Sequence, residues 1–222
     1  MKKILIIAAA LLSFGCVSEP SMQTGPDAEY THDGLVRIDN ARFSRAWIDP
    51  DADLKRYNKI MVADTEFEFR AVKKTSQSTM ITSNTREFYI SDANKQKLID
   101  TVTAVFAEEL QNSESFTITD TPDAETLLIV GGLLDIVSRI PPEQIGAGGI
   151  YLSSLGEATL VLEAKDALSG ETLYRAADRR RVEPVGREMM ESNTVTNYSE
   201  VRRWAKRWAM RLREGLDSIH AQ

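Results

Sequence analysis

Residues 126–137 read TLLIVGGLLDIV, an almost unbroken apolar run. A strand with one face on water alternates apolar and polar residues, whereas a run that is apolar on both faces is typical of a strand in the middle of a sheet. Gly131 and Gly132 interrupt the run. Inside a strand such glycines indicate a bulge or a close backbone approach rather than a binding loop. This stretch therefore predicts the central strand of the fold.

Further strands are predicted on both sides of this run in the sequence. The segment 59–64 is apolar, and Phe67 and Phe69 extend it after a break. Segments 157–166 and 172–180 alternate apolar and polar residues around a Ser-Gly turn, which is typical of a β-hairpin. The predicted strands cover residues 59–64, 67–69, 116–119, 126–137, 157–166 and 172–180.

Two long helices are predicted from apolar residues that recur at helical spacing. The first begins at Ser91 or Asp92, and the second has a start resembling a capping box at Asn197 and Glu200. The sequence therefore predicts an α+β fold: one domain over residues 35–222, with a mixed sheet of about four to six strands and both helices packed on one face. The apolar stripes are Leu98, Val102, Val105, Phe106 and Leu110, then Val201, Trp204, Ala205, Trp208, Leu212, Leu216 and Ile219.

The N-terminus has the pattern of an export signal. Lys2 and Lys3 precede the apolar run 4–12, which is shorter than the roughly 20 residues that a membrane-spanning helix needs. The segment 12–16, LSFGC, resembles the lipobox of bacterial lipoproteins, which implies cleavage after residue 15 and lipidation of Cys16. The residues before Cys16 also fit an ordinary cleavage site, which would give a soluble periplasmic protein instead.

The segment after the signal is predicted to carry the lipid and to act as a tether. Residues 16–34 contain Cys16 and then mostly polar and turn-forming residues. As a flexible coil, this segment would reach about 20–25 Å from a membrane surface. Val17 stands where lipoproteins kept at the inner membrane carry aspartate, so the resemblance implies an outer-membrane lipoprotein that faces the periplasm.

Composition limits the partners. The whole chain has 27 basic and 33 acidic side chains, and removal of Lys2 and Lys3 with the signal lowers its net charge from −6 to −8. Nucleic-acid binders carry a basic footprint, so we expect no nucleic-acid partner. Cys16 is the one cysteine of the chain, so no internal disulfide can form. The predicted partners are the membrane, through the lipid anchor, and an envelope protein.

The inventory of reactive side chains predicts no catalytic site, metal site or small-molecule cofactor. The two histidines lie in the tether and near the C-terminus, and no serine stands in a Gly-x-Ser-x-Gly motif. The acidic segment 49–53 departs from a calcium loop, because Leu54 and Ile60 occupy its sixth and twelfth positions. We expect a helix cap there and a protein that is not an enzyme. The alternative is a periplasmic enzyme that uses Asp and Glu for acid–base chemistry.

Two surfaces are candidates for contact with a partner. The first is the apolar end of a glycine-rich loop, Ile150, Tyr151 and Leu152. This loop precedes a strand rather than a helix, so it does not predict a phosphate cradle. The second is the basic face of the last helix, where few acids stand at i−4 to neutralise the charge. A plain solvated face is the alternative. The basic residues proposed to touch a partner are Arg203, Lys206 and Arg207.

Three motifs resemble one bacterial lipoprotein family, the domain of unknown function 3313. The first motif is Trp47, followed by Asp49-Pro50 and by the segment 54–60. The second is the segment 166–171 within residues 156–178. The third, near the C-terminus, is Trp204 and Trp208 followed by Leu212 and Asp217. The resemblance covers residues 35–218. It implies an envelope lipoprotein of unknown molecular function and supplies no catalytic residues. Small lipoprotein domains of this layout resemble accessory subunits of envelope assemblies, so by analogy of fold and location we expect a non-catalytic binding or accessory module.

Overall fold

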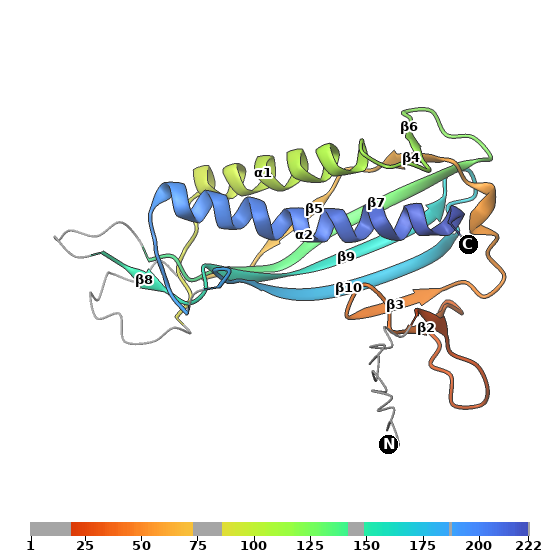
Figure 1. Cartoon of the computed structure of the whole chain (residues 1–222), viewed down its shortest axis with the longest axis horizontal. Helices are drawn as coiled ribbons and strands as arrows, with labels where there is room; N and C mark the ends of the chain where they lie inside the picture. Colours follow the sequence, from red (N-terminus) through yellow and green to blue (C-terminus); the bar gives the residue numbers. More distant parts are fainter. Residues whose placement is uncertain (1–18, 73–85, 142–148, 187, 222) are drawn as a thin grey trace, which may run out of the picture.

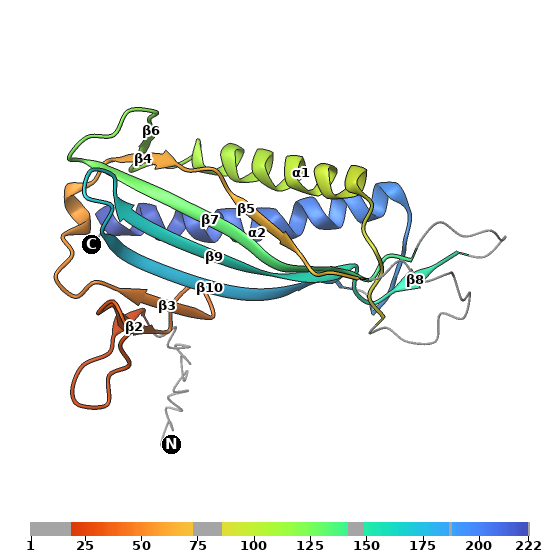
Figure 2. The ribbon, with the colours of Figure 1, turned by 180° about the vertical axis from the view of Figure 1, so that it is seen from behind.

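The apolar run forms the middle of the sheet, as predicted. It is strand β7, Thr126–Ser138, which pairs antiparallel with β9, Gly156–Asp166. On its other side it pairs in parallel with β4, Lys59–Val62, and with β5, Glu66–Phe69. The computed structural model describes residues 19–72, 86–141, 149–186 and 188–221. Figures 1 and 2 show the long strands running side by side, with both helices across one face.

The α+β fold is confirmed, but over the described residues the sheet has nine strands rather than four to six. Its order is β1-β2-β3-β10-β9-β7-β4-β6, with β5 also on β7. The extra strands have two to four residues, too few to show a period of two in the sequence. They are β1, Ser21–Met22; β2, Val36–Asp39; and β3, Arg45–Ile48, whereas β6, Thr117–Ile118, lies within the predicted strand 116–119. The predicted hairpin is formed by β9 and β10, Thr172–Val182, while β8, Tyr151–Leu152, pairs separately with β11, Met190–Glu191.

Residues 19–34, which were predicted to be part of a free tether, lie against the edge of the sheet. Strand β1 pairs with β2, and Tyr30 forms a bridge with Val36. The Asp33 carboxylate accepts a hydrogen bond of 2.7 Å from Arg175 on β10. This part of the chain therefore differs from the coil that its composition predicted. Cys16 and the cleavage site lie outside the described residues.

Both predicted helices are present and lie side by side with their N-termini at the same end (Figure 1). Helix α1 covers Asp92–Leu110, with Ser91 as its N-cap. Helix α2 covers Thr194–His220 and begins earlier than predicted, because Asn193 forms a capping box with Thr196. The predicted stripes face the core, where Trp204 and Trp208 are 3% and 0% exposed. No helix in the described ranges is both long enough and apolar enough to cross a membrane.

Alternation along the long strands places the core between the sheet and the helices. Every second residue of β9 is buried, and the intervening residues are half-buried on the other face. The buried Asp178 of β10 joins the layers: Trp208 Nε1 on α2 donates to its Oδ2 at 2.8 Å, and Ser44 and Arg180 also donate to it. Burial alone would raise the pKa of Asp178, but these donors lower it, so the carboxylate stays ionised.

Candidate functional site

A cavity of about 570 Å³ lies where the two helices begin. It is bounded by the first turns of α1 and α2 and by the ends of three strands, the C-terminal ends of β7 and β10 and the N-terminal end of β9. This is the end of the molecule that carries β8, on the left in Figure 1. Its volume is within the range of small-molecule sites, which is roughly 300–1,000 Å³.

Part of the cavity wall is aliphatic. Helix α1 contributes Leu98 and helix α2 contributes Val201, both half-buried, while Leu155 and Val182 come from the sheet side and are buried. These side chains come from four separate parts of the sequence, and the fold brings them to one place. Polar side chains such as Asn94, Thr101 and Asn197 line the cavity as well, so it offers an aliphatic surface beside hydrogen-bonding groups.

Trp204 is the most buried of the helix residues that line the cavity, at 3% exposure. Its ring packs against Trp208 with centroids 4.3 Å apart and an angle of 52° between the planes. The indole Nε1 of Trp204 is buried and has no acceptor among the described residues. A buried donor without an acceptor lowers the stability of the fold by about 1–3 kcal/mol, so the Trp204 N–H is locally destabilising.

Exposed tyrosines surround the mouth of the cavity. Tyr89 and Tyr198 line it, and the ring of Tyr151 lies next to Gly149, another lining residue. All three side chains are exposed, at 40%, 42% and 58% respectively. The ammonium group of Lys97 lies 5.4 Å from the centre of the Tyr198 ring. The mouth is therefore amphipathic, with aromatic surface that has both an apolar body and a polar tip.

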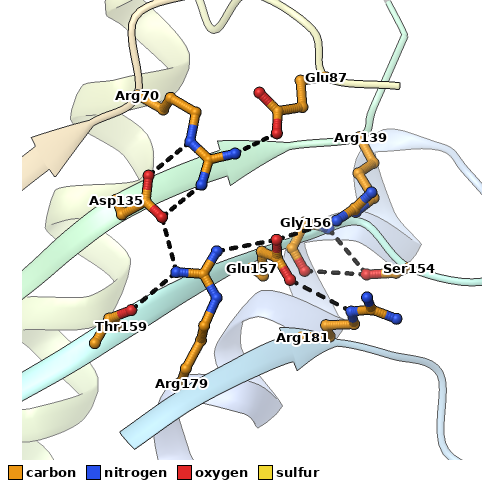
Figure 3. Close-up of polar contacts among 10 residues, drawn as sticks. All are labelled: Arg70, Glu87, Asp135, Arg139, Ser154, Gly156, Glu157, Thr159, Arg179 and Arg181. Atoms are coloured by element: carbon orange, nitrogen blue, oxygen red, sulfur yellow. Dashed lines mark hydrogen bonds and ion pairs between the residues drawn. The ribbon is translucent and has the colours of Figure 1, made fainter. Parts of the chain in front are cut away.

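An ion-pair network holds the strands next to the cavity in place (Figure 3). A register irregularity in β7 places Asp135 at φ 53°, a conformation that non-glycine residues seldom adopt. Arg70 Nε and Nη2 donate to its carboxylate at 2.6 and 2.5 Å, and Arg179 donates at 2.8 Å. The hydrogen bonds from Arg70, then those from Arg179, lower the pKa of Asp135 to about 2. Paired guanidinium groups therefore stabilise the bulge.

Glu157, a carboxylate that lines the cavity, belongs to the same network. Its oxygens lie 3.1 Å from Arg139, 3.0 Å from Arg179 and 3.3 Å from Arg181. Burial would raise the pKa of Glu157, but the hydrogen bond from Arg179 and the nearby positive charges lower it overall. A carboxylate held ionised in this way is poorly suited to donate a proton at neutral pH.

The apolar loop that was predicted to contact a partner divides into three different environments. Ile150 is half-buried and lines the cavity, Tyr151 is exposed, and Leu152 is 5% exposed within the core. Leu152 of β8 is the strand partner of Met190 of β11, which is also buried. The prediction that Leu152 belongs to an accessible surface is therefore wrong, because its side chain is already covered by this chain.

The basic face of α2 is largely neutralised, contrary to the prediction. Lys206 pairs with Glu109 of α1 at 2.9 Å, and Arg203 pairs with Glu200 at 2.7 Å. The partners on α1 are about a hundred residues away in sequence, so a search for acids one turn away could not find them. Arg207 remains exposed and has no ion-pair partner in the parts of the chain that the structure describes.

The other candidate groups have structural roles. Asp49 accepts from the backbone N–H of Asp51, and Asp53 caps a short 3₁₀ helix, Leu54–Arg56, so the expected cap falls four residues later than predicted. His220 packs on Phe116 and contacts the carbonyl of Tyr57 at 2.8 Å. Within the described ranges, no group of three or more His, Cys, Asp or Glu side chains could hold a metal ion.

Comparisons with known proteins give a family and distant structural neighbours. A neuraminyllactose-binding hemagglutinin homolog from Helicobacter pylori is similar at 10% identity, over 74% of this chain and 85% of that one, with a TM-score of 0.39. Protein XCC0632 from Xanthomonas campestris is similar at 7% identity, over 75% and 87%, with a TM-score of 0.40. A PelC dodecamer from Paraburkholderia phytofirmans is similar at 12% identity, over 68% and 89%, with a TM-score of 0.31. No curated protein sequence matches. A family model matches residues 30–212, and the chain therefore belongs to the family described as "Protein of unknown function (DUF3313)".

Proposed function

We propose that this protein is a non-catalytic binding module of the bacterial envelope, held at the periplasmic face of the outer membrane by lipid on Cys16. The observation that carries the binding role is the cavity of about 570 Å³, which lies at one end of the domain and has both aliphatic and polar side chains in its walls. A site of this kind can hold a ligand through shape and apolar burial without a reactive group.

The state of the carboxylates supports binding rather than acid–base catalysis. An enzyme of the alternative class needs a carboxyl group with a raised pKa that can donate a proton near neutral pH. Two buried aspartates instead have lowered pKa values: burial would raise the pKa of Asp178, but its donors outweigh it, and at Asp166 the hydrogen bond from the backbone N–H of Ser169 is the largest cause. Glu157 beside the cavity follows the same trend.

The anchor is tested on Cys16 itself. Two or more acyl chains hold a protein firmly, because each buried CH₂ contributes about 0.8 kcal/mol. Mass spectrometry of the mature N-terminal peptide should show Cys16 carrying diacylglycerol and palmitate, with the protein in the outer-membrane fraction. The Cys16→Ala variant should be recovered as precursor or in the soluble fraction. An unmodified Cys16 thiol on a cleaved chain would refute the anchor and favour the soluble periplasmic alternative.

An envelope protein partner is also part of this proposal. Tyr151 on β8 and Arg207 on α2 are exposed residues of the predicted contact surfaces, and Arg203 and Lys206 are exposed but already paired with acids. A contact through Arg207 should weaken with salt, since exposed charges are screened over about 8 Å at physiological ionic strength. A contact through Tyr151 should persist, because apolar burial is not screened.

A further inference from the structure

We propose that the cavity at the helix N-termini binds a single acyl chain, taken from a fatty acid or from a membrane phospholipid. This inference rests on the proposed binding role and names the chemistry of its ligand. Three observations support it: the aliphatic side chains in the cavity wall, the amphipathic mouth, and the presence of both positive and negative side chains at the rim.

The walls match a hydrocarbon chain. Leu98, Val201, Leu155 and Val182 present methyl groups from both helices and from the sheet, and Trp204 adds an aromatic surface at the inner end. Burial of apolar surface stabilises a complex by roughly 25 cal/mol per Å² before the costs of association. A flexible chain can follow an aliphatic surface whose side chains come from four separate elements.

The mouth matches the boundary between hydrocarbon and water. Tyr89 and Tyr198 line the cavity, and the ring of Tyr151 lies beside the lining residue Gly149. Val195, which is 77% exposed, directly follows the lining residue Thr194. Exposed apolar side chains that gather in one place mark an interaction site, whereas single ones do not. Tyrosine is favoured where one end of a side chain is apolar and the other is wet. An acyl chain that enters here keeps its polar head outside, among the tyrosine hydroxyl groups.

The charges at the rim do not select a head group. Lys97 lies at the mouth, but so does the carboxylate of Glu191, and Glu157 is compensated by arginines. A site built for a particular charged head would show an excess of the opposite charge. The recognised part is therefore the chain, and both fatty acids and phospholipids qualify as sources.

Tryptophan fluorescence provides a direct test, because bromine atoms on an acyl chain quench an indole that they contact. The chain has three tryptophans, and of these Trp204 lines the cavity. The protein used is the mature chain, residues 16–222, with Cys16→Ala, since every residue of the described core lies after residue 34. One arm adds dibromostearic acid at monomeric concentrations, and the other adds vesicles of brominated phosphatidylcholine. Saturable quenching is expected with the fatty acid in a Trp47→Phe background and should be mostly lost in Trp204→Phe.

Variants separate the cavity from adsorption elsewhere. Val201→Phe fills part of the cavity and should weaken dibromostearate binding by about tenfold or more, the effect of a misplaced group in an apolar pocket. Val161→Phe is the matched control, on a half-buried valine of β9 that does not line the cavity. If Val201→Phe unfolds, Tyr198→Ala at the exposed mouth serves instead, with Tyr30→Ala, 63% exposed near the N-terminus, as its control.

Each outcome decides the proposal. Quenching that depends on Val201 and Tyr198 but not on Val161 and Tyr30 supports it, and quenching by the vesicles as well identifies membrane phospholipid as a source. Quenching that is equal in all variants overturns it, because the chain then binds elsewhere. No quenching in either arm also overturns it, including the case in which an apolar protein segment is the true occupant. The state of Cys16 does not affect these results, so failure of the anchor and failure of the ligand are distinguishable.

Discussion

Trp204 and Trp208, one turn apart on α2, differ in whether their indole N–H groups are hydrogen-bonded. Trp208 donates to the buried Asp178 and is fully covered, which locks helix and sheet together. Trp204 is nearly as buried, yet its N–H has no acceptor among the described residues. Buried donors are normally paired, so an unpaired one calls for an explanation. The unpaired indole N–H belongs to a residue of the cavity wall, which makes Trp204 the costlier of the two tryptophans to bury.

At the scale of single residues, Gly156 is the position where any side chain is excluded. A Cβ atom there would lie 2.1 Å from the carbonyl oxygen of Val137, a backbone atom that cannot move aside without disturbing β7. Gly156→Ala should therefore destabilise the protein by about 1–3 kcal/mol or more, as overpacking does. Urea unfolding monitored by circular dichroism measures the change.

Gly215 on α2 provides the matched control for this substitution. A Cβ atom at Gly215 would meet its nearest neighbour, Arg42 Cδ, at 3.8 Å, which is an ordinary contact. Gly215→Ala should increase the free energy of unfolding by about 0.5–1 kcal/mol, because alanine favours a helix interior over glycine. Equal effects of the two substitutions would contradict the steric argument.

At the scale of elements, α1 and α2 are joined by charge as well as by apolar packing. Glu109 of α1 is 6% exposed and lies 2.9 Å from Lys206 and 3.6 Å from Arg213 of α2. We expect Glu109→Gln to lower the free energy of unfolding by about 1–3 kcal/mol, since it leaves charged donors poorly paired at a buried position. Denaturant titration of the variant measures this loss.

The neighbouring pair provides a control with the same chemistry at the surface. Glu108 pairs with Arg202 at 2.6 Å, but both side chains are more than 40% exposed. Glu108→Gln should change stability by less than about 1 kcal/mol, and 1 M salt should remove most of that change. A larger loss at Glu108 than at Glu109 would contradict the view that burial sets the value of these ion pairs.

Long helices and strands could be predicted from the sequence, because each repeats its apolar pattern many times. Contacts between elements could not be predicted. The strand β7, the hairpin β9–β10 and both helical stripes follow from patterns within one segment. The pairing of Lys206 with Glu109 and the docking of residues 19–34 depend on partners far away in sequence. The cavity was missed for the same reason, because its walls come from both helices and three strand ends, and no single segment carries its signal.

At the scale of the whole molecule, ionised carboxylates tie distant parts of the fold together. Asp166 at the end of β9 accepts from Tyr57 at 2.8 Å and from the backbone of Ser169 at 2.7 Å. Asp135 joins β7 to β10 through Arg179. The backbone N–H of Ser169, above all, lowers the pKa of Asp166 well below its usual range, and the hydrogen bonds from Arg70 lower that of Asp135 to about 2.

These lowered pKa values predict a loss of stability in acid. In the unfolded chain aspartate titrates near pH 3.9, so below about pH 5 the unfolded state binds more protons than the folded state. The stabilisation from Asp135 is therefore fully present above that range and is lost as pH falls toward about 2. The urea midpoint should fall steadily between pH 5 and pH 2. The Asp135→Asn variant should be less stable at pH 7 and should lose less on acidification. Asp51→Asn, at an exposed carboxylate that accepts no hydrogen bond from the described residues, should follow the parent curve. A midpoint that is independent of pH in the parent chain would show that these carboxylates do not hold the fold together.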